Sequence, residues 1–493
     1  MMKKIIKIYL LIIVAISFTG CSDEYFDVNT PVDSVPLDQL DMKDLMGPVL
    51  YNTSLAQYYA STVASNYSQY LGGYGYTSAG KSEMSATWSS IYLRVLPNLK
   101  IIKDKADQKG ALHYGAVASI VEAINIALAT DMWDEIPYSQ AGNTTEFPHP
   151  LFESQEQIYS AVFSLLDQAI QALEAPDNSF ISMGNEDLIY GGDFDKWLRA
   201  AYTLKARYQL HLVQKGITTP NEVLTSIANG FTSNDDNFMM VYPDNELNPW
   251  YQSAVLTRAT GNYFIAPNDQ LISMMNGTTY PFQSGVEIDP RLPEIYVNEG
   301  NIGDPWRGGM NGGDGDSSDG EPLNTYFKDG GYYTTNTSPL ILVTYAEAMF
   351  IKAEAAFLAN SGTSTSVGSN TEAYNAYMTG IAASISQIGV DGTDYLADGS
   401  VDVGEASLML NHIMKEKYIA NILNPETYTD FRRYNFSSDV FKGLAIRLNL
   451  DDTVDEYDGL WFRRAIYPSS ERNSNPNISN YEQEPTVNVW WAN

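Results

Sequence analysis

The sequence predicts an all-α fold, because apolar stripes at helical spacing, helix caps and closely spaced helix pairs recur along it. Residues 154–174 are the clearest helix, since Ser154 suits the N-cap and Gln157 completes a capping box. An apolar stripe at helical spacing runs through this segment and through 339–359, where Pro339 stands near the start. Both segments are therefore expected to be amphipathic helices over their full length.

Further segments show the same helical periodicity. The segment 111–131 is apolar on more than one face, which predicts a central position in the core. Many of the helices follow one another with short links, which favours helix-hairpin stacking of the tetratricopeptide kind, although no consensus of ~34 residues repeats cleanly. The remaining predicted helices are 38–71, 86–106, 111–131, 194–215, 220–229, 268–276, 371–388 and 403–423.

A long, irregular, aromatic-rich region, about 231–338, separates the helical parts. Loops of this length in a compact protein are usually functional or disordered. The interleaved tryptophans and tyrosines argue against disorder, because disordered segments are poor in aromatic residues. We therefore expect this region to form loops with minor β-structure and to carry the binding function.

The N-terminus has the pattern of a bacterial export signal. Lys3, Lys4 and Lys7 accompany a short apolar run, which is too short for an ordinary membrane-spanning helix. Cys21 follows Gly20 directly, and "FTGC" resembles a lipobox, in which the chain is cut before the cysteine and the cysteine is lipidated. A buried cysteine in an anchor helix is the weaker alternative.

This pattern predicts the domain organisation. Residues 1–20 are the expected lipoprotein signal peptide, 21–36 a lipidated flexible tether and 37–493 a single domain. Since Cys21 is the only cysteine, the mature chain would have no thiol left for a disulfide, for catalysis or for a metal. The expected location is the outer membrane, with a lipid anchor and exposure at the cell surface.

The charge balance excludes one class of partner. Lysine and arginine number 29 against 60 acids, for a net charge of −31. Such a surface repels the phosphate backbone, so nucleic-acid binding is not expected. The 34 tyrosines suit wet binding surfaces, because each has an apolar face and a polar tip, but packing in the core would explain many of them as well.

Motifs of enzymes are missing from the sequence. The histidines His113, His149, His211 and His412 do not stand at metal-ligand spacing from one another. No GxSxG motif supports a nucleophilic serine, and the glycine-rich runs lack the ending of a phosphate loop. Carboxylate pairs are too frequent among 60 acids to indicate a glycoside hydrolase. We therefore expect no enzyme and no cofactor.

A weak calcium site is the one metal candidate. Asp314, Asp316 and Asp319 cluster in "GGDGDSSDG", and calcium prefers clustered carboxylates. In an EF-hand, however, the third acid and the glycine would each come one place earlier, and Thr325 stands where a glutamate is needed. A solvated acidic turn is the better interpretation.

Loop aromatics beside amide and charged side chains are the candidates for ligand contact. Sugar rings stack on Trp and Tyr, while Asn, Asp and Arg bond to their hydroxyls, and loops on a rigid scaffold often carry function. For each aromatic, packing in the core is the alternative. The candidates are Tyr74, Tyr76, Asn248, Trp250, Tyr251, Asn262, Tyr263, Trp306 and Arg307.

The stretch 127–141, "ALATDMWDEIPYSQA", is where the central helix is expected to end. Pro137 disfavours helical backbone at the residue before it, so the helix must stop near Trp133. We expect Trp133 and Tyr138 to fill the gap between this helix and the next pair. Asp131 or Asp134 would then hold the turn by hydrogen bonds.

Several motifs together resemble the SusD/RagB family of outer-membrane nutrient-binding lipoproteins. "TDMWDEIPYSQA" is similar to that family's D-W-G-D-I-P-Y-S-E-A signature, with Asp134 in place of the usual glycine. The resemblance spans essentially the whole mature chain. Further matching segments are "IDPRLPEIY" (288–296), "IMKEKYIANILNPETYTDFRRYNF" (413–436), "YPSSERNSNPNISNY" (467–481) and the ending "VWWAN".

The resemblance implies a SusD-like fold with four tetratricopeptide-like helix hairpins and a ligand face made of loops. It implies a surface lipoprotein that captures oligosaccharide, or in some relatives peptide, and delivers it to a SusC-like TonB-dependent barrel. It does not transfer ligand residues, because those vary within the family. For a peptide, the negative charge would favour basic sequences, and Arg258 or Arg307 could hold a terminal carboxylate.

Overall fold

The computed structural model describes residues 39–72, 80–143, 145–261, 265–310, 315–446 and 457–493. Residues Met42–Asn493 form one unit. The expected signal peptide 1–20, the lipidation site Cys21 and the tether 21–36 lie outside the described residues.

A central helix, α5 (Leu112–Trp133), organises the helical half of this unit. It is buried along most of its length, as expected from apolar residues on more than one face. By length and composition α5 is apolar enough to cross a membrane, but 78% of its apolar window is buried inside the protein, as in the core helix of a soluble protein. The helix packs against α2 (Met42–Tyr67) on one side and α6 (Gln155–Glu174) on another.

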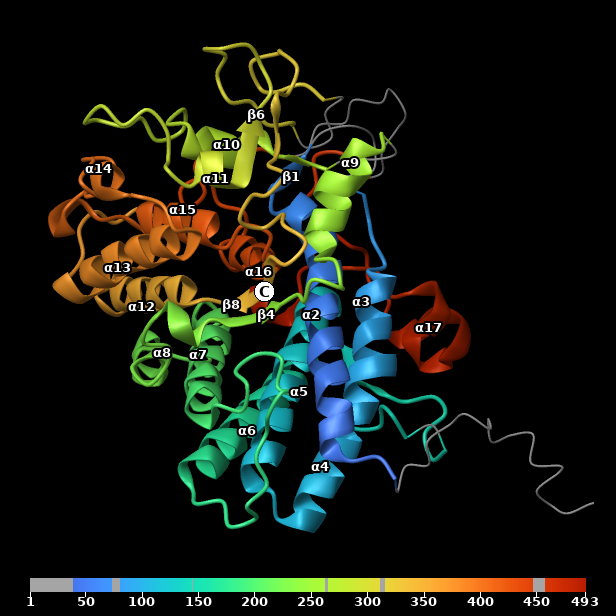
Figure 1. The fold of residues 1–493 in the computed structure, drawn as a ribbon. Coiled ribbons are helices and arrows are strands. Elements are labelled where there is room, and N and C mark those ends of the chain that lie inside the picture. The colour runs from blue at the N-terminus through green and yellow to red at the C-terminus, as the bar shows by residue number, and fades with distance from the viewer. Residues whose placement is uncertain (1–38, 73–79, 144, 262–264, 311–314, 447–456) are drawn as a thin grey trace, which may run out of the picture. The chain divides into compact units, whose positions relative to one another are not determined.

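Successive helices pack on one another from α4 (Leu96–Lys109) to α8 (Pro220–Ile227), and α8 packs on α12 (Tyr345–Ala359) (Figure 1). Such consecutive packing agrees with the helix-hairpin stacking that the short links predict. The capping box expected at Ser154 is present, with the Gln157 amide bonded to its hydroxyl. The other long helices are α7 (Phe194–Val213) and α13 (Thr371–Ile388).

The structure corrects three predicted helices. Residues 339–343 are a strand, β8 (Pro339–Val343), and α12 begins after Thr344, whose hydroxyl accepts the Glu347 amide. The segment 86–106 is divided, and its middle is the π-helix η2 (Ser90–Val95) between α3 (Ser85–Ser89) and α4. The segment 403–423 begins with the 3-10 turn η5 (Glu405–Ser407), and only α15 (Leu410–Ala420) is α-helical.

The predicted irregular region 231–338 contains short ordered elements joined into small antiparallel ladders. β4 (Phe238–Val241) pairs with β8, which explains why the apolar run after Pro339 is extended rather than helical. β6 (Tyr296–Asn298) pairs with β7 (Thr325–Phe327). The remaining strands and short helices of the described residues are β1 (Leu71–Gly72), β2 (Ile136–Pro137), β3 (Phe152–Glu153), β5 (Ala266–Pro267), η3 (Asn234–Asp236), η4 (Tyr251–Leu256), α9 (Thr257–Ala259), α10 (Asp269–Met275), α11 (Leu292–Ile295), α14 (Thr393–Leu396), α16 (Glu426–Arg433), α17 (Ser469–Ser474), η6 (Pro476–Asn480) and η7 (Trp490–Ala492).

The expected end of α5 is confirmed, but its side chains contact other segments than predicted. α5 ends at Trp133, which is fully buried. Its ring packs edge-on against Trp88 of α3, with 5.1 Å between the ring centroids, and its Nε1 donates to the Ile466 carbonyl at 3.0 Å. Tyr138 turns back to Glu122 of α5, 2.8 Å away. The gap that Trp133 fills therefore lies toward α3 and the C-terminal segment, whereas Tyr138 bonds back to α5.

The acids of this stretch join distant segments rather than holding the turn. The turn itself is held by Thr130, whose hydroxyl donates to the Asp134 carbonyl at 2.6 Å. Asp134 forms an ion pair with Arg464 and accepts the Trp490 amide at 2.9 Å. The acids of this stretch therefore stabilise the packing of distant segments rather than forming a reactive site.

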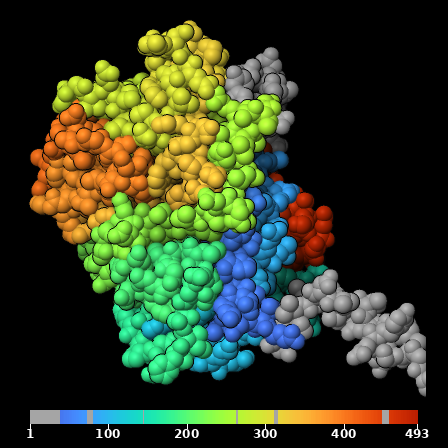
Figure 2. Space-filling view, in the orientation of Figure 1, coloured from blue at the N-terminus to red at the C-terminus, as the bar shows by residue number. Residues whose placement is uncertain are grey.

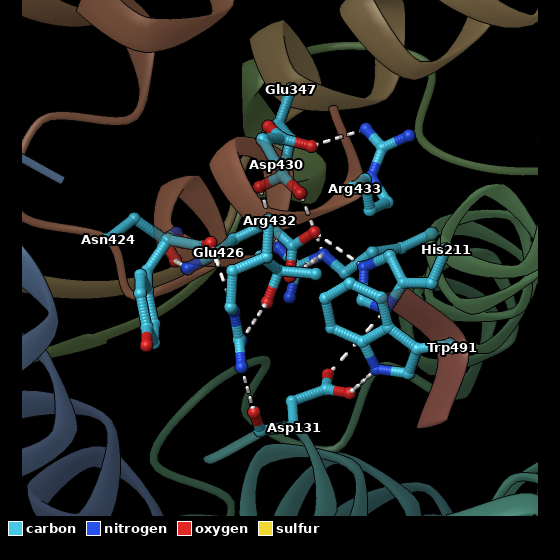
Figure 3. A network of polar contacts seen from close by, with 12 residues as sticks. Asp131, His211, Glu347, Asn424, Glu426, Asp430, Arg432, Arg433 and Trp491 are labelled. Carbon is cyan, nitrogen blue, oxygen red and sulfur yellow. Dashed lines mark hydrogen bonds and ion pairs between the residues drawn. The ribbon is translucent and has the colours of Figure 1, made fainter. Parts of the chain in front are cut away.

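A buried network of charged side chains connects α5, α7, α12, α16 and η7 (Figure 3). Asp131 accepts hydrogen bonds from Tyr159 at 2.7 Å and from the Trp491 indole at 2.8 Å. Arg433 of α16 makes a two-pronged pair with Glu354 of α12, at 2.8 and 3.1 Å. Because buried charges must be paired, this network fixes how the helices meet.

Candidate functional site

Five of the sequence candidates, Tyr74, Tyr76, Asn262, Tyr263 and Asp314, lie outside the described residues. Two described segments that border these candidates, β1 and β5, pair with each other, and Gly72 stands opposite Ala266 in their ladder. A side chain at Gly72 would not fit, because its Cβ would lie 2.4 Å from the Gly309 carbonyl oxygen. This close packing joins the segments around 72, 266 and 309.

Asn248 and Trp250 are structural in this fold. Asn248 has no exposed surface, and its Oδ1 accepts the amides of Trp250 (2.7 Å) and Tyr251 (3.0 Å), while its Nδ2 donates to the Ser338 carbonyl (2.8 Å). Such contacts are those of a helix N-cap. Trp250 is 4% exposed and packs edge-on against Tyr58 at 4.8 Å. Their burial corrects the interpretation of both as ligand contacts, since a buried ring offers no face for stacking.

Tyr251 is half-buried and opens the π-helix η4, which leads into α9. On α9, the Arg258 guanidinium lies 3.9 Å above the ring of Tyr326 and forms an ion pair with Glu299. Beside this pair is an open cleft of about 580 Å³ between η4–α9 and the β6–β7 ladder. It is lined by Val255, Arg258, Ala259, Val297, Glu299, Phe327, Lys328 and Asp329.

Trp306 lines a second open cleft, of about 600 Å³. The tryptophan is half-buried, and its carbonyl is held by the Asn276 side-chain amide at 3.1 Å. An accessible aromatic ring with amides and carboxylates around it can stack on a sugar and bond to its hydroxyls. The other lining residues are Thr278, Glu287, Ile288, Asn298, Gly300, Asn301, Ile302, Gly303, Asp304 and Pro305. Figure 2 shows the yellow segment around β6 beside the lime-green segment of α9.

Arg307 is engaged in an ion pair rather than pointing freely into this cleft. Its Nε lies 2.7 Å from an oxygen of Asp319. Hydrogen bonds from Ser317 and Arg307 lower the pKa of Asp319 to about 2. The pair also bears on the calcium candidate, because it occupies Asp319, while Asp316 is exposed. Among the described residues no group of three His, Cys, Asp or Glu could hold a metal ion.

The buried network offers no place for a substrate. Asp131, His211 and Glu426 are each less than a tenth exposed. The cavity that Asp131 and Glu426 line holds about 20 Å³, which is room for a single water molecule. Burial raises the pKa of Asp131, although His211 and Tyr159 oppose that rise. A shifted pKa at this position reflects the packing of the core.

Sequence reasoning missed Tyr326 and Asn276, which have no motif of their own. Tyr326 meets Arg258 only because the β6–β7 ladder folds beside α9, and Asn276 meets Trp306 across a loop. The available signal was weak, a tyrosine in an alternating apolar strand and an asparagine after a helix. Both contacts depend on long-range folding.

Comparison with known proteins agrees with this architecture. No curated protein matches the chain. A SusD/RagB family protein from Bacteroides thetaiotaomicron is 22% identical, with a TM-score of 0.69 over 92% of this chain and 99% of that one. A chitin-binding SusD homolog from Flavobacterium johnsoniae is 20% identical, with a TM-score of 0.70 over 92% and 98%.

The model of the SusD-like family, described as "Starch-binding associating with outer membrane", matches residues 37–444. The match covers most of the helical stack and both open clefts. With its all-α fold and small β-ladders, the chain belongs to the SusD-like family.

Proposed function

We propose that this protein binds oligosaccharides and acts as a capture protein rather than as an enzyme. The observation that carries the proposal is Trp306, a partly accessible indole in an open cleft of about 600 Å³ among asparagine amides. Stacking of a sugar on the indole and hydrogen bonds from the amides would supply affinity without a reactive group. The family's description as starch-binding and the chitin-binding relative support this class of ligand.

The cellular role that we propose is that of a surface lipoprotein of the outer membrane. Lipidation at Cys21 would anchor the chain, and a SusC-like TonB-dependent barrel would receive the captured oligosaccharide. The lipobox and the family's association with the outer membrane support this role. The proposed binding requires no cofactor, and metal-content analysis of the purified protein tests the calcium candidate at Asp314, Asp316 and Asp319.

The decisive experiment is Trp306→Ala, assayed on a glycan array and by calorimetry with starch and chitin oligosaccharides. We expect affinity to fall by about 5- to 150-fold, since a lost stacking contact costs about 1–3 kcal/mol, and the melting temperature to stay unchanged. Trp490→Ala is the matched control, because Trp490 is also half-buried but lies at the C-terminal segment under Lys215. If the wild-type protein binds no saccharide at millimolar concentration, the proposal fails.

Peptide capture is the second candidate, favoured by the charged cleft beside Arg258. That cleft has cations, Arg258 and Lys328, and anions, Glu299 and Asp329, on its walls. Such a lining suits the charged ends and side chains of a peptide. Mass spectrometry of ligands that co-purify with the native protein from its membrane distinguishes the two candidates, since peptides and glycans differ in mass and fragmentation.

A further inference from the structure

A third cleft, here called the C-terminal cleft, lies between Lys81 and the segment from Tyr457 to Pro485, on the side of the unit that carries α17 (Figure 1). Its volume is about 420 Å³. The loop aromatics chosen from the sequence do not line it, whereas the family-like segment 467–481 contributes Tyr467 and Arg472. It is lined by Lys81, Tyr457, Arg464, Ala465, Ile466, Tyr467, Arg472, Glu482, Gln483, Glu484 and Pro485.

Three cations from separate segments meet in the C-terminal cleft. Arg464 forms part of the wall with a side chain only 4% exposed, and it is anchored by Asp134 and by the carbonyl of Asn488 at 2.9 Å. Arg472 of α17 pairs with Glu83 at 2.6 Å and with Glu482 at 3.8 Å, and the exposed Lys81 lies 3.4 Å from the Tyr457 hydroxyl. In a chain of net charge −31, three cations thus line one cleft, and acids of the chain pair with the two arginines.

Side chains that accept hydrogen bonds line the same cleft. Glu482, Gln483 and Glu484 are exposed there, and the hydroxyl of Tyr457 donates to Glu484 at 3.0 Å. Their carboxylates and the amide oxygen suit hydroxyl donors. The carboxylates of Glu482 and Glu484 also repel a ligand that carries anionic groups along its length. The cleft therefore combines cations with acceptors, and the pair of Arg472 with Glu482 joins the two sets.

We propose that the C-terminal cleft binds the single carboxylate of an acidic sugar. This inference rests on the proposed glycan binding and specifies its ligand class. The carboxylate would take charge-assisted hydrogen bonds from Lys81 and Arg472, with the buried Arg464 behind them, while the sugar hydroxyls donate to the glutamates. A neutral sugar would leave the cations without a new partner, and a polyanion would meet the repulsion of Glu482 and Glu484.

The negative charge of the whole protein does not prevent this binding. At physiological ionic strength charges are screened beyond about 8 Å, so the residues that line the cleft determine the potential felt by a bound carboxylate. The same screening gives a test. Affinity for an acidic sugar should fall when sodium chloride is raised, whereas affinity for the neutral sugar should not change.

The experiment is calorimetric titration of the full chain with matched sugars that differ by one carboxylate. Sialyllactose is compared with lactose, and glucuronyl-xylotriose with xylotriose. The two comparisons distinguish a carboxylate carried by sialic acid from one carried by glucuronic acid. We expect at least one acidic sugar to bind more tightly than its neutral counterpart. Lys81→Met and Arg472→Met should each weaken that binding about tenfold, as expected for one charge-assisted hydrogen bond.

Lys100→Met is the matched control, because Lys100 is an exposed cation of α4 paired with Asp104. It should leave every affinity unchanged. The tested side chains lie at the surface, so all variants should keep the wild-type melting temperature.

If acidic-sugar binding survives in the double variant Lys81→Met/Arg472→Met, this inference is overturned but the proposed function is not. Binding of neutral glycans without any preference for the carboxylate would have the same consequence. Binding of no glycan of either kind would overturn both this inference and the proposed function.

Discussion

His211 Nε2 lies 2.6 Å from Glu426 Oε1 in the core, and both side chains are almost completely buried. The two residues are 215 positions apart, on α7 and α16. The other ring nitrogen of His211 lies 2.7 Å from the Tyr159 hydroxyl, which donates to Asp131. One imidazole therefore connects three helices, α6, α7 and α16, to the central helix α5 (Figure 3).

Replacing His211 by alanine should leave Glu426 buried without this partner. We expect the free energy of unfolding to fall by about 3–5 kcal/mol, the usual cost of breaking a buried pair. Urea unfolding followed by circular dichroism measures the loss. His149→Ala, at an exposed position, should change it by less than about 0.5 kcal/mol. A His211 variant as stable as the control would show that the pair does not hold the helices together.

The buried glutamates predict a dependence of stability on pH. Burial alone would raise the pKa of Glu354, but Arg433 and Lys417 outweigh it and hold the pKa at about 2. In the unfolded chain the same pKa is near 4.5. A lowered pKa in the folded state stabilises the fold above the unfolded pKa, and this stabilisation is lost as the pH falls.

We therefore expect the free energy of unfolding to decrease between about pH 4.5 and pH 2, measured by urea titration at each pH. Glu426 and Glu416, whose pKa values are also about 2, lose stabilisation in the same range. Glu354→Gln should be less stable at pH 7 and should show a shallower decrease on acidification. An unchanged slope in this variant would contradict the assignment.

Trp133→Ala should cost stability and not ligand affinity. The side chain is fully buried between α3 and the segment at Ile466, so its removal leaves a large cavity. We expect a loss of about 3–5 kcal/mol in unfolding free energy and an unchanged affinity for oligosaccharide in the folded fraction. The opposite pattern is expected for Trp306→Ala. A well-folded Trp133 variant that no longer binds would make this residue part of the site.

Asn248→Ala should destabilise the start of the helix that carries Tyr251. The loss of the cap and of the bond to the Ser338 carbonyl should lower the free energy of unfolding by about 1–2 kcal/mol. The amides of Trp250 and Tyr251 donate hydrogen bonds to Asn248. Their hydrogen exchange should therefore become faster in the variant. Asn301→Ala, at an exposed loop position, is the control for both measurements. Unchanged exchange would show that the cap does not order this helix.

Much of the helical scaffold could be predicted because local signals agree with the tertiary structure there. The capping box of Ser154 and the apolar faces of α5 and α6 are determined by residues close in sequence. The strand after Pro339 was not predictable in this way, because the apolar run alone fits helix or strand. Its partner β4 lies about a hundred residues earlier, and the ladder between them decides the conformation.

The candidate site was less predictable than the scaffold. An asparagine and a tryptophan in an apparent loop, Asn248 and Trp250, have the composition of a sugar contact, but the structure uses one as a cap and buries the other. Trp306, chosen by the same rule, lines an open cleft. Composition cannot separate these cases, since exposure depends on which distant segments cover a residue.

By itself the sequence determined the helical class, the end of the central helix near Trp133 and the family resemblance, because these depend on periodicity, caps and local motifs. Only the tertiary structure decided which aromatics are accessible, that the acids beside Trp133 pair with Arg464 and Trp491, and that Lys81, Arg464 and Arg472 meet in one cleft. The physical reason is that burial and charge pairing are properties of residues brought together from hundreds of positions apart, which local patterns do not encode.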